Sequence, residues 1–364
     1  MKTVAILYGG KSGEHEVSLR SGGSVFSHLN RDLYNPILIA VDHNGIWYYQ
    51  QNTGFEEDQK TLTLERKKNL IVSVIPGLGF YCNGKKLEID IVFPVLHGTF
   101  GEDGTLQGLL EIAGITYAGT GVLGSAVGMD KSVAKQVWIQ SGLPVVPFIT
   151  VRAGSGLNNE DTFKQVVEKF GFPLFVKPAN AGSSVGVTKV NSFDELKSGV
   201  KNGFRYDTKL LIEPAIEGRE IECSVIGNMK PVSFLPGEVI SDNFYDYDSK
   251  YIHPENVNLS VPAKLTDNEI SKIKETAEKA FLTSEAEGFA RVDFFIENKT
   301  GKILLNEINT LPGFTEISMF AKLCDVSGLS YKDMLTKIIK LAEERYKRRN
   351  KLVFKKEATS VHEQ

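Results

Sequence analysis

Apolar and polar residues alternate along two stretches near the end of the chain, and this alternation predicts an antiparallel pair of strands. The two stretches, residues 289–296 and 302–308, are rich in Phe, Val, Ile and Leu and are separated by Asn-Lys-Thr-Gly. A three-residue loop over 299–301 places Gly301 in the left-handed conformation that such loops use. In this register one face of the hairpin is apolar and packs on a core. Its members are Val292, Phe294, Leu304 and Ile308.

The opposite face of this hairpin is polar. Asp293 lies opposite Glu307, and Arg291 lies opposite Asn309. Two carboxylates and an amide oxygen that face one another are stable at neutral pH only with a cation or a shared proton between them. Hard oxygen ligands favour Mg2+, which usually binds beside substrate phosphates. The spacing alone leaves an alternative open, an ordinary hairpin whose polar face is solvated.

The segment after the hairpin adds features suited to an anion. Asn309 leads into a turn at Pro312 and Gly313 whose backbone amides can face a negative charge. Arg291 supplies a fixed positive fork for phosphate or carboxylate. Both features favour a site over a solvated surface.

The beginning of the chain predicts a doubly wound α/β unit. A short strand over 3–7 runs into a glycine-rich loop, and residues 17–29 then have the apolar spacing of a helix. Glu14 lies near the helix N-terminus, where a carboxylate aimed into the cleft can hold a substrate ammonium. A glycine loop of this kind is also compatible with a simple tight turn.

Two more strands, over 37–42 and 89–94, extend this unit. His97 follows the second of them, at the carboxyl end where ligands gather in an open α/β sheet. A structural histidine is the alternative at this position.

The middle of the chain predicts an amphipathic helix from residue 125 onward with Asp130 early in it, and then a strand over 172–178. The small-residue loop after this strand suits a cover over polyphosphate, since glycines allow close backbone approach and hydroxyls donate hydrogen bonds. It lacks the GxxxxGK[ST] pattern, so a P-loop fold is disfavoured. Lys131 and Lys177 are candidate phosphate ligands, and two solvated surface lysines are the alternative.

The later part of the chain combines one more strand, over 209–213, with two amphipathic helices, over 266–283 and 331–346. Between them, residues 241–254 form a polar, aromatic-rich loop whose length and composition indicate an active-site lid. A mobile surface loop is the alternative. The short basic stretch after Arg345 is assigned no partner.

Composition excludes several functional classes. With 364 residues, of which 41% are hydrophobic and 24% charged, the chain is a globular protein of two or three domains. A net charge of -3 offers no electrostatic case for nucleic acid or a membrane surface. The apolar runs are too short to span a bilayer, and the first residues lead into a strand rather than a signal peptide, so we expect a cytoplasmic protein. Its three cysteines lack metal-site spacing and are expected to be reduced packing thiols.

The motifs RVDFF and NEINTLPGFTEIS, together with GGKSGEHEVS near the start and FYDYDSKY in the expected lid, resemble those of the D-alanine:D-alanine ligases of the ATP-grasp superfamily. The resemblance extends to about Lys340. It implies a three-domain ATP-grasp fold, in which an N-terminal doubly wound parallel-sheet domain (1–119) is followed by two α+β domains (120–212 and 213–364) that clasp the nucleotide.

The resemblance also implies an activity, the ATP-dependent ligation of two D-alanines through a D-alanyl phosphate for peptidoglycan synthesis. It implies two Mg2+ ions, with Mn2+ as a substitute, and a homodimer. It places Glu14, Ser183, Tyr251, Arg291 and Gly313 at the reacting groups, and Asp293, Glu307 and Asn309 at the metal. It places His97, Lys250, Ser318 and Met319 around the substrates. It assigns ATP to Lys131, Lys177, Ser184, Glu213, Pro214, Ile216, Glu220 and Lys250.

Two positions bear on how closely the family pattern is followed. Members often carry a lysine where this chain has Pro214, so a side-chain donor to adenine is lost while the backbone carbonyl remains. Members that make depsipeptides tend to carry Phe at the position of Tyr251, so the tyrosine favours peptide formation. A D-alanine:D-lactate or D-alanine:D-serine ligase remains the runner-up, and a nucleotide-binding regulatory protein with a decayed site is the alternative of another class.

Overall fold

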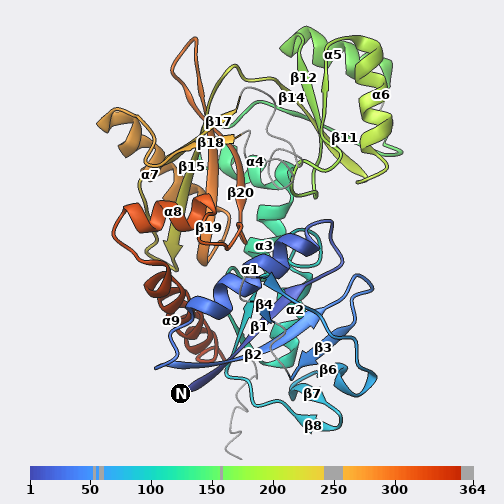
Figure 1. Cartoon of the computed structure of the whole chain (residues 1–364). Coiled ribbons are helices and arrows are strands. Elements are labelled where there is room, and N and C mark those ends of the chain that lie inside the picture. The colour runs from blue at the N-terminus through green and yellow to red at the C-terminus, as the bar shows by residue number, and fades with distance from the viewer. Residues whose placement is uncertain (52–54, 57–60, 156–158, 242–256, 354–364) are drawn as a thin grey trace, which may run out of the picture.

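The computed structural model describes residues 1–51, 55–56, 61–155, 159–241 and 257–353. It contains three larger β-sheets, each with its own helices (Figure 1). The predicted lid over 241–254, including Lys250 and Tyr251, lies outside the described residues except for Ser241. No helix in the described part of the chain combines the length and apolar character needed to cross a membrane.

The first sheet has the strand order β10-β9-β1-β2-β3. Its parallel strands are β1 (Lys2–Gly9), β2 (Tyr34–Val41), β9 (Ile91–Pro94) and β10 (Thr116–Tyr117), and β3 (Trp47–Gln50) is an antiparallel edge. The helices α1 (His15–His28) and α2 (Thr105–Ala113) pack on it. The predicted strand, glycine loop and helix are therefore confirmed.

Smaller elements complete this part of the chain. They are the strands β4 (Phe55–Glu56), β5 (Thr61–Leu62), β6 (Val72–Ile75), β7 (Gly79–Cys82) and β8 (Lys85–Lys86), and the short 3-10 helix Lys68–Leu70.

The second sheet is antiparallel, in the order β11-β14-β12-β13. Its elements are β11 (Ile149–Arg152), α5 (Glu160–Phe170), β12 (Leu174–Pro178), β13 (Thr188–Val190), α6 (Phe193–Gly203) and β14 (Lys209–Pro214). The small-residue loop joins β12 to β13. As Figure 1 shows, α5 and α6 cover the outer side of this sheet.

Two helices, α3 (Val122–Met129) and α4 (Lys131–Gln140), connect the first sheet to the second. The prediction of a single helix from residue 125 onward is wrong, because the chain breaks at Asp130. This residue is extended and caps α4, its carboxylate accepting a hydrogen bond from the Val133 N–H at 3.0 Å. The break directs Lys131 toward the backbone of the β12–β13 loop, where the Lys131 N–H donates to Ala179 O at 3.0 Å.

The third sheet has the order β18-β17-β15-β19-β20, with β16 paired to β15. Its elements are β15 (Gly218–Gly227), β16 (Val232–Ser233), β17 (Gly237–Ser241), β18 (Val257–Ser260), α7 (Asp267–Thr283), β19 (Gly288–Glu297), β20 (Ile303–Asn309), α8 (Met319–Val326) and α9 (Tyr331–Arg349). Both predicted helices are confirmed. A capping box at Thr266 and Glu269 begins α7.

The predicted hairpin is β19 and β20, and its polar register is confirmed: Asp293 pairs with Glu307 and Arg291 with Asn309. The loop is not the three-residue loop we expected. The Glu297 N–H donates to Lys302 O at 2.9 Å, so four residues connect the strands, and Gly301 has φ +66°. A bulge at Asn306 then restores the register at the site, because Phe294 pairs with Leu305 and Asp293 with Glu307.

The bulge also changes one member of the apolar face. Val292, Phe294 and Ile308 are buried as predicted, but Leu304 is only half-buried and Leu305 is fully buried in its place. A bulge adds one residue to one strand, so side chains beyond it exchange faces.

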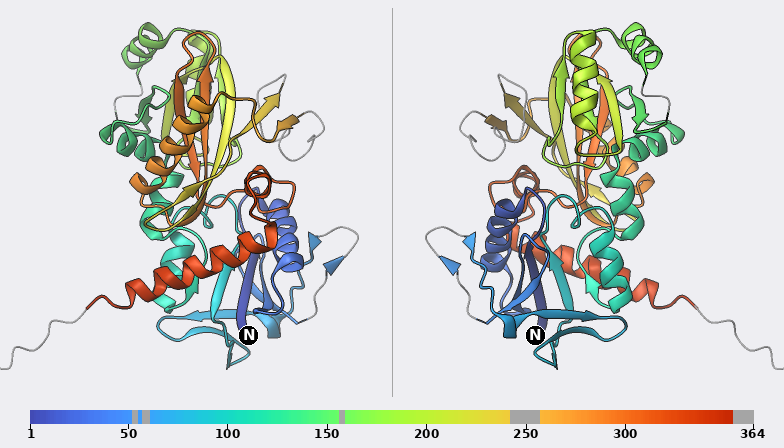
Figure 2. Two further views of the ribbon diagram at one scale, coloured as in Figure 1. Left: turned by 90° about the vertical axis from the view of Figure 1, so that its left-hand side faces the viewer. Right: turned by 90° about the vertical axis from the view of Figure 1, so that its right-hand side faces the viewer.

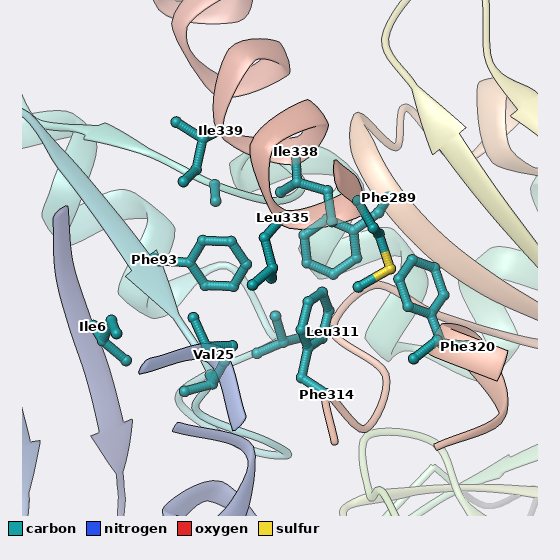
Figure 3. Packing of buried hydrophobic residues seen from close by; sticks show 14 of the residues in the cluster. Ile6, Val25, Phe93, Phe289, Leu311, Phe314, Phe320, Leu335, Ile338 and Ile339 are labelled. Carbon is teal, nitrogen blue, oxygen red and sulfur yellow. The ribbon is translucent and has the colours of Figure 1, made fainter. Parts of the chain in front are cut away.

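The first and third sheets share one hydrophobic core. Ile6 and Phe93 of the first sheet lie in the same cluster as Phe289 of β19 and Ile338 and Ile339 of α9 (Figure 3). In both views of Figure 2, α9 lies against the N-terminal sheet. The guanidinium of Arg345 donates to the carbonyls of Tyr117 and Gly119. This packing orients β19 and β20 toward the carboxyl ends of the N-terminal strands.

Candidate active site

A cavity of about 930 Å3 opens where the three sheets meet, and its walls come from all of them. Most residues singled out in the sequence line this cavity. They are Glu14, His97, Lys131, Lys177, Ser183, Ser184, Glu213, Pro214, Ile216, Glu220, Arg291, Glu307, Asn309, Gly313, Ser318 and Met319. Asp293 is 2% exposed and lies behind Arg291, to which it is bound. Lys250 and Tyr251 belong to the segment that the structure does not describe.

Glu14 directly precedes α1 and reaches across to the loop between β12 and β13. Its carboxylate accepts a hydrogen bond from the Ser183 hydroxyl. Two glycines allow this approach: a Cβ at Gly98 would lie 2.6 Å from Glu14 Oε2, and a Cβ at Gly182 would lie 3.0 Å from it. Glu14 is 8% exposed, so a carboxylate is held at the cavity wall with little water around it. Such a group suits a substrate cation.

The β12–β13 loop has an unusual backbone at the position facing Glu14. Ser183 and Ser184 have φ values of +49° and +58°, in the left-handed region that non-glycine residues adopt infrequently. Strained backbone of this kind concentrates at binding sites, where the surrounding structure holds it in place.

His97 is buried and connects two parts of the cavity wall. Its Nδ1–H donates to Leu311 O at 3.0 Å, and Nε2 accepts from the Ser21 hydroxyl of α1 at 2.9 Å. Burial lowers the pKa of His97, and the nearby charge of Glu14 only partly opposes this. The imidazole is therefore neutral at pH 7 and positions the segment that follows β20.

The polar face of the hairpin is held by Arg291. Its Nε and Nη2 donate to the two oxygens of Asp293 at 2.7 Å each, and Nε lies 3.1 Å from Glu222 Oε2 on the neighbouring strand β15. Burial alone would lower the pKa of Arg291, but the charges of Asp293 and Glu222 outweigh it and raise the pKa well above its ordinary value. The side-chain amide of Asn309 donates to Asp293 Oδ2 at 2.9 Å, which leaves its oxygen to act as a ligand.

Glu307 faces Lys131, with 3.4 Å between Oε2 and Nζ. Asp293, Glu307 and Asn309 thus present oxygen donors on one face of the β19–β20 hairpin, and Arg291 and Lys131 compensate the charges of the two carboxylates. This donor set fits a hard divalent cation such as Mg2+, because it consists of carboxylate and amide oxygens with no imidazole or thiolate.

A buried ion-pair group forms the wall beside β14. Lys177 Nζ lies 2.7 Å from Glu213 Oε2, and Lys135 Nζ is paired with Glu213 Oε1. Burial would raise the pKa of Glu213, but the two lysines outweigh it and hold the pKa below its ordinary value. Burial lowers the pKa of Lys135 to about 8, even though Glu213 opposes this shift. Both carboxylate oxygens of Glu213 are therefore already used by side chains.

The turn after β20 is anchored on both sides. The Phe314 N–H donates to the Ser21 hydroxyl at 3.4 Å, and the Tyr331 hydroxyl donates to Phe314 O. Gly313 lies close to Ser318, whose Oγ would be 3.0 Å from an added Cβ. Ser318 directly precedes α8, and its hydroxyl lies 2.7 Å from the Thr315 hydroxyl instead of capping that helix. The Met319 side chain is 6% exposed and belongs to the apolar core, so it offers the cavity mainly backbone.

Sequence reasoning missed several polar residues of this site. Among them are Glu102, Glu222 and Asn306 of the cavity wall and Lys135, which is paired with Glu213 behind it. Two of them carried a usable signal: Lys135 follows Lys131 by one helical turn, and Glu222 shares a strand face with Glu220. Glu102 accepts from the Gly98 N–H at 2.7 Å, and burial together with the charge of Glu14 raises its pKa well above the ordinary value. Asn306 meets Lys177 at 3.4 Å only because of the bulge.

Family models match both parts of the chain. The model for the D-ala D-ala ligase N-terminus matches residues 3–120, and that for the D-ala D-ala ligase C-terminus matches residues 137–340. A D-alanine–D-alanine ligase of Treponema denticola is 42% identical over 362 residues, covering 96% of this chain and 98% of its own. A D-alanine–D-alanine ligase A of Chromobacterium violaceum is 43% identical over 352 residues, covering 94% and 95%.

Solved structures of ligases have the same fold as this chain. The D-alanine-D-alanine ligase from Coxiella burnetii superposes with a TM-score of 0.83 at 34% identity, covering 96% of this chain and 98% of that one. The VanG D-Ala:D-Ser ligase from Enterococcus faecalis superposes with a TM-score of 0.81 at 34% identity, covering 94% and 99%. Fold and site together therefore define an enzyme of the ATP-grasp class. Within that class, the chain belongs to the D-alanine–D-alanine ligase family.

Proposed function

We propose that this protein joins two D-alanines in an ATP-dependent reaction that passes through a D-alanyl phosphate and releases ADP and phosphate. The observation that carries this is the single cavity in which an acidic helix N-terminus, two lysines and an oxygen-rich hairpin meet. The product, D-alanyl-D-alanine, serves peptidoglycan synthesis, and the family membership of the chain supports this assignment.

ATP is proposed to lie between the second and third sheets. Its adenine is placed against Glu213, Pro214 and Ile216, and its ribose near Glu220. Nearby, the Ala215 N–H donates a hydrogen bond to Pro173 O at 3.0 Å, which ties this segment to the start of β12. The carboxylate of Glu213 holds Lys177 and Lys135, so we assign Glu213 this anchoring task in addition to its place beside adenine.

The phosphates are proposed to contact Lys131, Lys177, Ser184 and Lys250. Lys131 is paired with Glu307, and Lys177 with Glu213. Phosphate oxygens carry more negative charge than a carboxylate and would attract both lysines more strongly. Asp293, Glu307 and Asn309 would hold two Mg2+ ions, for which Mn2+ can substitute. When bound, these ions neutralise the charge of the transferring phosphoryl group.

The chemistry has two steps. A carboxylate oxygen of the first D-alanine attacks the terminal phosphorus, the bond to ADP breaks, and an acyl phosphate forms. The amine of the second D-alanine then attacks the carbonyl carbon, loses a proton, and phosphate leaves. Arg291 and the backbone amide of Gly313 are proposed to stabilise the phosphoryl group and the developing oxyanion.

We assign the two substrates to the two ends of the cavity. Glu14 is proposed to bind the ammonium of the first D-alanine, in a hydrogen-bond network with Ser183 and Tyr251. The second D-alanine is proposed to lie near His97, with its carboxylate toward Ser318, the backbone of Met319 and Lys250. The expected lid would exclude water, which would otherwise hydrolyse the acyl phosphate.

We also propose the division into domains at 1–119, 120–212 and 213–364, a cytoplasmic location and a homodimer. The helices α2 and α3 are in contact and expose the large apolar side chains of Leu109, Ile112 and Leu123, which suits a subunit interface. Sedimentation of the purified chain tests the dimer, and a single species of monomer mass would refute it.

A phosphate-release assay tests the function. Phosphate release is expected with ATP, Mg2+ and D-alanine, and it is expected to be far lower without D-alanine. Chromatography of the complete reaction is expected to show D-alanyl-D-alanine. The variant Glu307→Gln keeps the side-chain shape but loses one charge of the proposed metal site, so its turnover is expected to collapse. Glu297→Gln, the same change at the far end of the hairpin, is the matched control. ATP binding without D-alanine-dependent release would instead support a regulatory protein with a decayed site.

A further inference from the structure

A second group of metal-binding side chains lies outside the cavity just described. His15 and Glu16 begin α1, and His43 lies in the turn that joins β2 to β3. One candidate ligand atom from each of the three lies within 4.8 Å of the other two, an arrangement that no other trio of His, Cys, Asp or Glu in the described ranges shares. The reaction proposed above uses none of these three side chains.

His15 is oriented as metal-binding histidines usually are. It is 5% exposed, and its Nδ1 lies 2.7 Å from the carbonyl oxygen of Gly10. A carbonyl oxygen only accepts hydrogen bonds, so Nδ1 carries the proton and Nε2 is the atom that remains for a metal. Metal-binding histidines typically donate their other ring N–H to a carbonyl or carboxylate in this manner, which fixes the tautomer and the ring orientation.

The turn that carries His43 is also held in place. The carboxylate of Asp42 accepts hydrogen bonds from the N–H groups of Asn44 and Ile46, each at 2.9 Å. Such a bonded turn fixes the backbone on both sides of His43. The ring of His43 stacks on that of His15 with 3.8 Å between centroids.

Gly9 allows the two segments to come this close. The Gly10 N–H donates to Val41 O at 2.8 Å, which joins the glycine loop to the end of β2. A Cβ at Gly9 would lie 2.2 Å from Val41 O and 3.2 Å from His15 Cε1, so any side chain there would clash with the end of β2 and crowd the His15 ring.

We propose that His15, Glu16 and His43 bind a transition-metal cation of the Zn2+ class, with water at the fourth position. Imidazole nitrogen favours Zn2+ over Mg2+, which prefers oxygen donors. A tetrahedral Zn2+ with bonds of about 2.1 Å needs ligand atoms about 3.4 Å apart. The side chains of Glu16 and His43 are exposed and can rotate to close the remaining distance, while His15 stays fixed.

The bound ion would join the first turn of α1 to the β2–β3 turn. Glu14 directly precedes this first turn, so the ion would also hold the segment that presents Glu14 to Ser183. A ligand that binds only the folded state stabilises it, and Zn2+ is therefore expected to raise the unfolding temperature of the protein.

The test is a titration of the full-length protein with Zn2+, against a chromogenic Zn2+ chelator and with Mg2+ in excess. One equivalent is expected to bind. His43→Ala is expected to weaken binding at least tenfold, and Glu16→Gln severalfold. His28→Ala, at the other end of α1, is the matched control and is expected to bind as the unchanged protein does. Because His43 is exposed, its variant should retain Mg2+-dependent phosphate release, which shows that the fold is intact.

Co2+ gives an independent readout, since a tetrahedral nitrogen and oxygen site produces intense visible absorption. We expect this band in the unchanged protein and its loss in His43→Ala. Absence of binding, equal binding by His43→Ala, or loss of binding in Glu307→Gln instead would each overturn the proposal; the last outcome would place the ion at the nucleotide site. The Zn2+ and Co2+ binding readouts do not depend on ligase turnover.

Discussion

Lys135 offers the sharpest physical test of the ion-pair group beside the cavity. It is 1% exposed and paired with Glu213, and burial lowers its pKa from 10.5 to about 8. A tenfold change in a proton-binding constant corresponds to about 1.4 kcal/mol, so this shift amounts to about 3 kcal/mol. The folded protein therefore keeps this lysine charged only at a substantial free-energy cost.

The sign of the pH dependence follows from proton counting. Between pH 8 and 10.5 the unfolded chain retains the proton of Lys135, whereas the folded protein releases it. The unfolded state then binds more protons, and the stability contributed by Lys135 rises with pH by about 1 kcal/mol per pH unit. Below pH 8 both states are protonated and the contribution is constant. Buried tyrosines and cysteines with raised pKa values lower stability over the same range, so a difference between variants is required.

The assay compares the free energy of unfolding in urea at pH 7, 8, 9 and 10 for the unchanged protein and for Lys135→Met. At pH 7 the variant is expected to be less stable by about 3 to 5 kcal/mol, since the buried carboxylate of Glu213 loses one of its two lysine partners. The difference is expected to stay level up to pH 8 and then to grow. Lys135→Arg keeps a charged partner for Glu213 that does not titrate in this range. The free energy of unfolding of the unchanged protein, minus that of Lys135→Arg, is therefore also expected to rise between pH 8 and 10. A difference that is flat or falls between pH 8 and 10 would refute the reasoning.

Three further predictions concern the proposed reaction. Gly98→Ala places a Cβ 2.6 Å from Glu14 Oε2 at a residue with φ +74°, so KM for D-alanine is expected to rise at least tenfold; steady-state kinetics check this, and an unchanged KM would contradict the placement of Glu14. Pro214→Lys restores a side-chain donor and is expected to tighten ATP by about 0.5 to 1.5 kcal/mol, the net worth of one hydrogen bond; weaker binding by calorimetry would mean that the hinge is shaped differently. The unchanged protein is expected to make little ester from D-lactate, whereas Tyr251→Phe gains ester, more at low pH where the amine of D-alanine is protonated; product analysis with both acceptors decides this, and ester as the main product of the unchanged protein would overturn it.

Local patterns in the sequence determined much of the secondary structure. The alternation in β19 and β20 predicted which face carries Arg291, Asp293, Glu307 and Asn309, because side chains of a strand point to opposite faces in turn. The apolar periods of α7 and α9 predicted both helices. These features depend on neighbours within a few residues, which a single sequence displays.

Tertiary structure decided the details that depend on distant partners. The bulge at Asn306 was invisible in the alternation, and it exchanged Leu304 for Leu305 in the core while bringing Asn306 to Lys177. The break before α4 was equally hidden, although Asp130 is a favourable cap, since an uninterrupted amphipathic period spans it.

The site itself is assembled from segments far apart in the chain. Glu14 meets Ser183 across 169 positions, and Lys135 meets Glu213 across 78. The sequence indicated which residue types form the site, because binding of phosphate, metal and ammonium requires lysine, carboxylate and amide groups. The family motifs located most of these residues. Their distances, and the choice of Lys135 and Glu222 as partners, depend on how the three sheets pack around a shared core. That packing is decided by the combined burial of many side chains, which no short stretch of sequence contains.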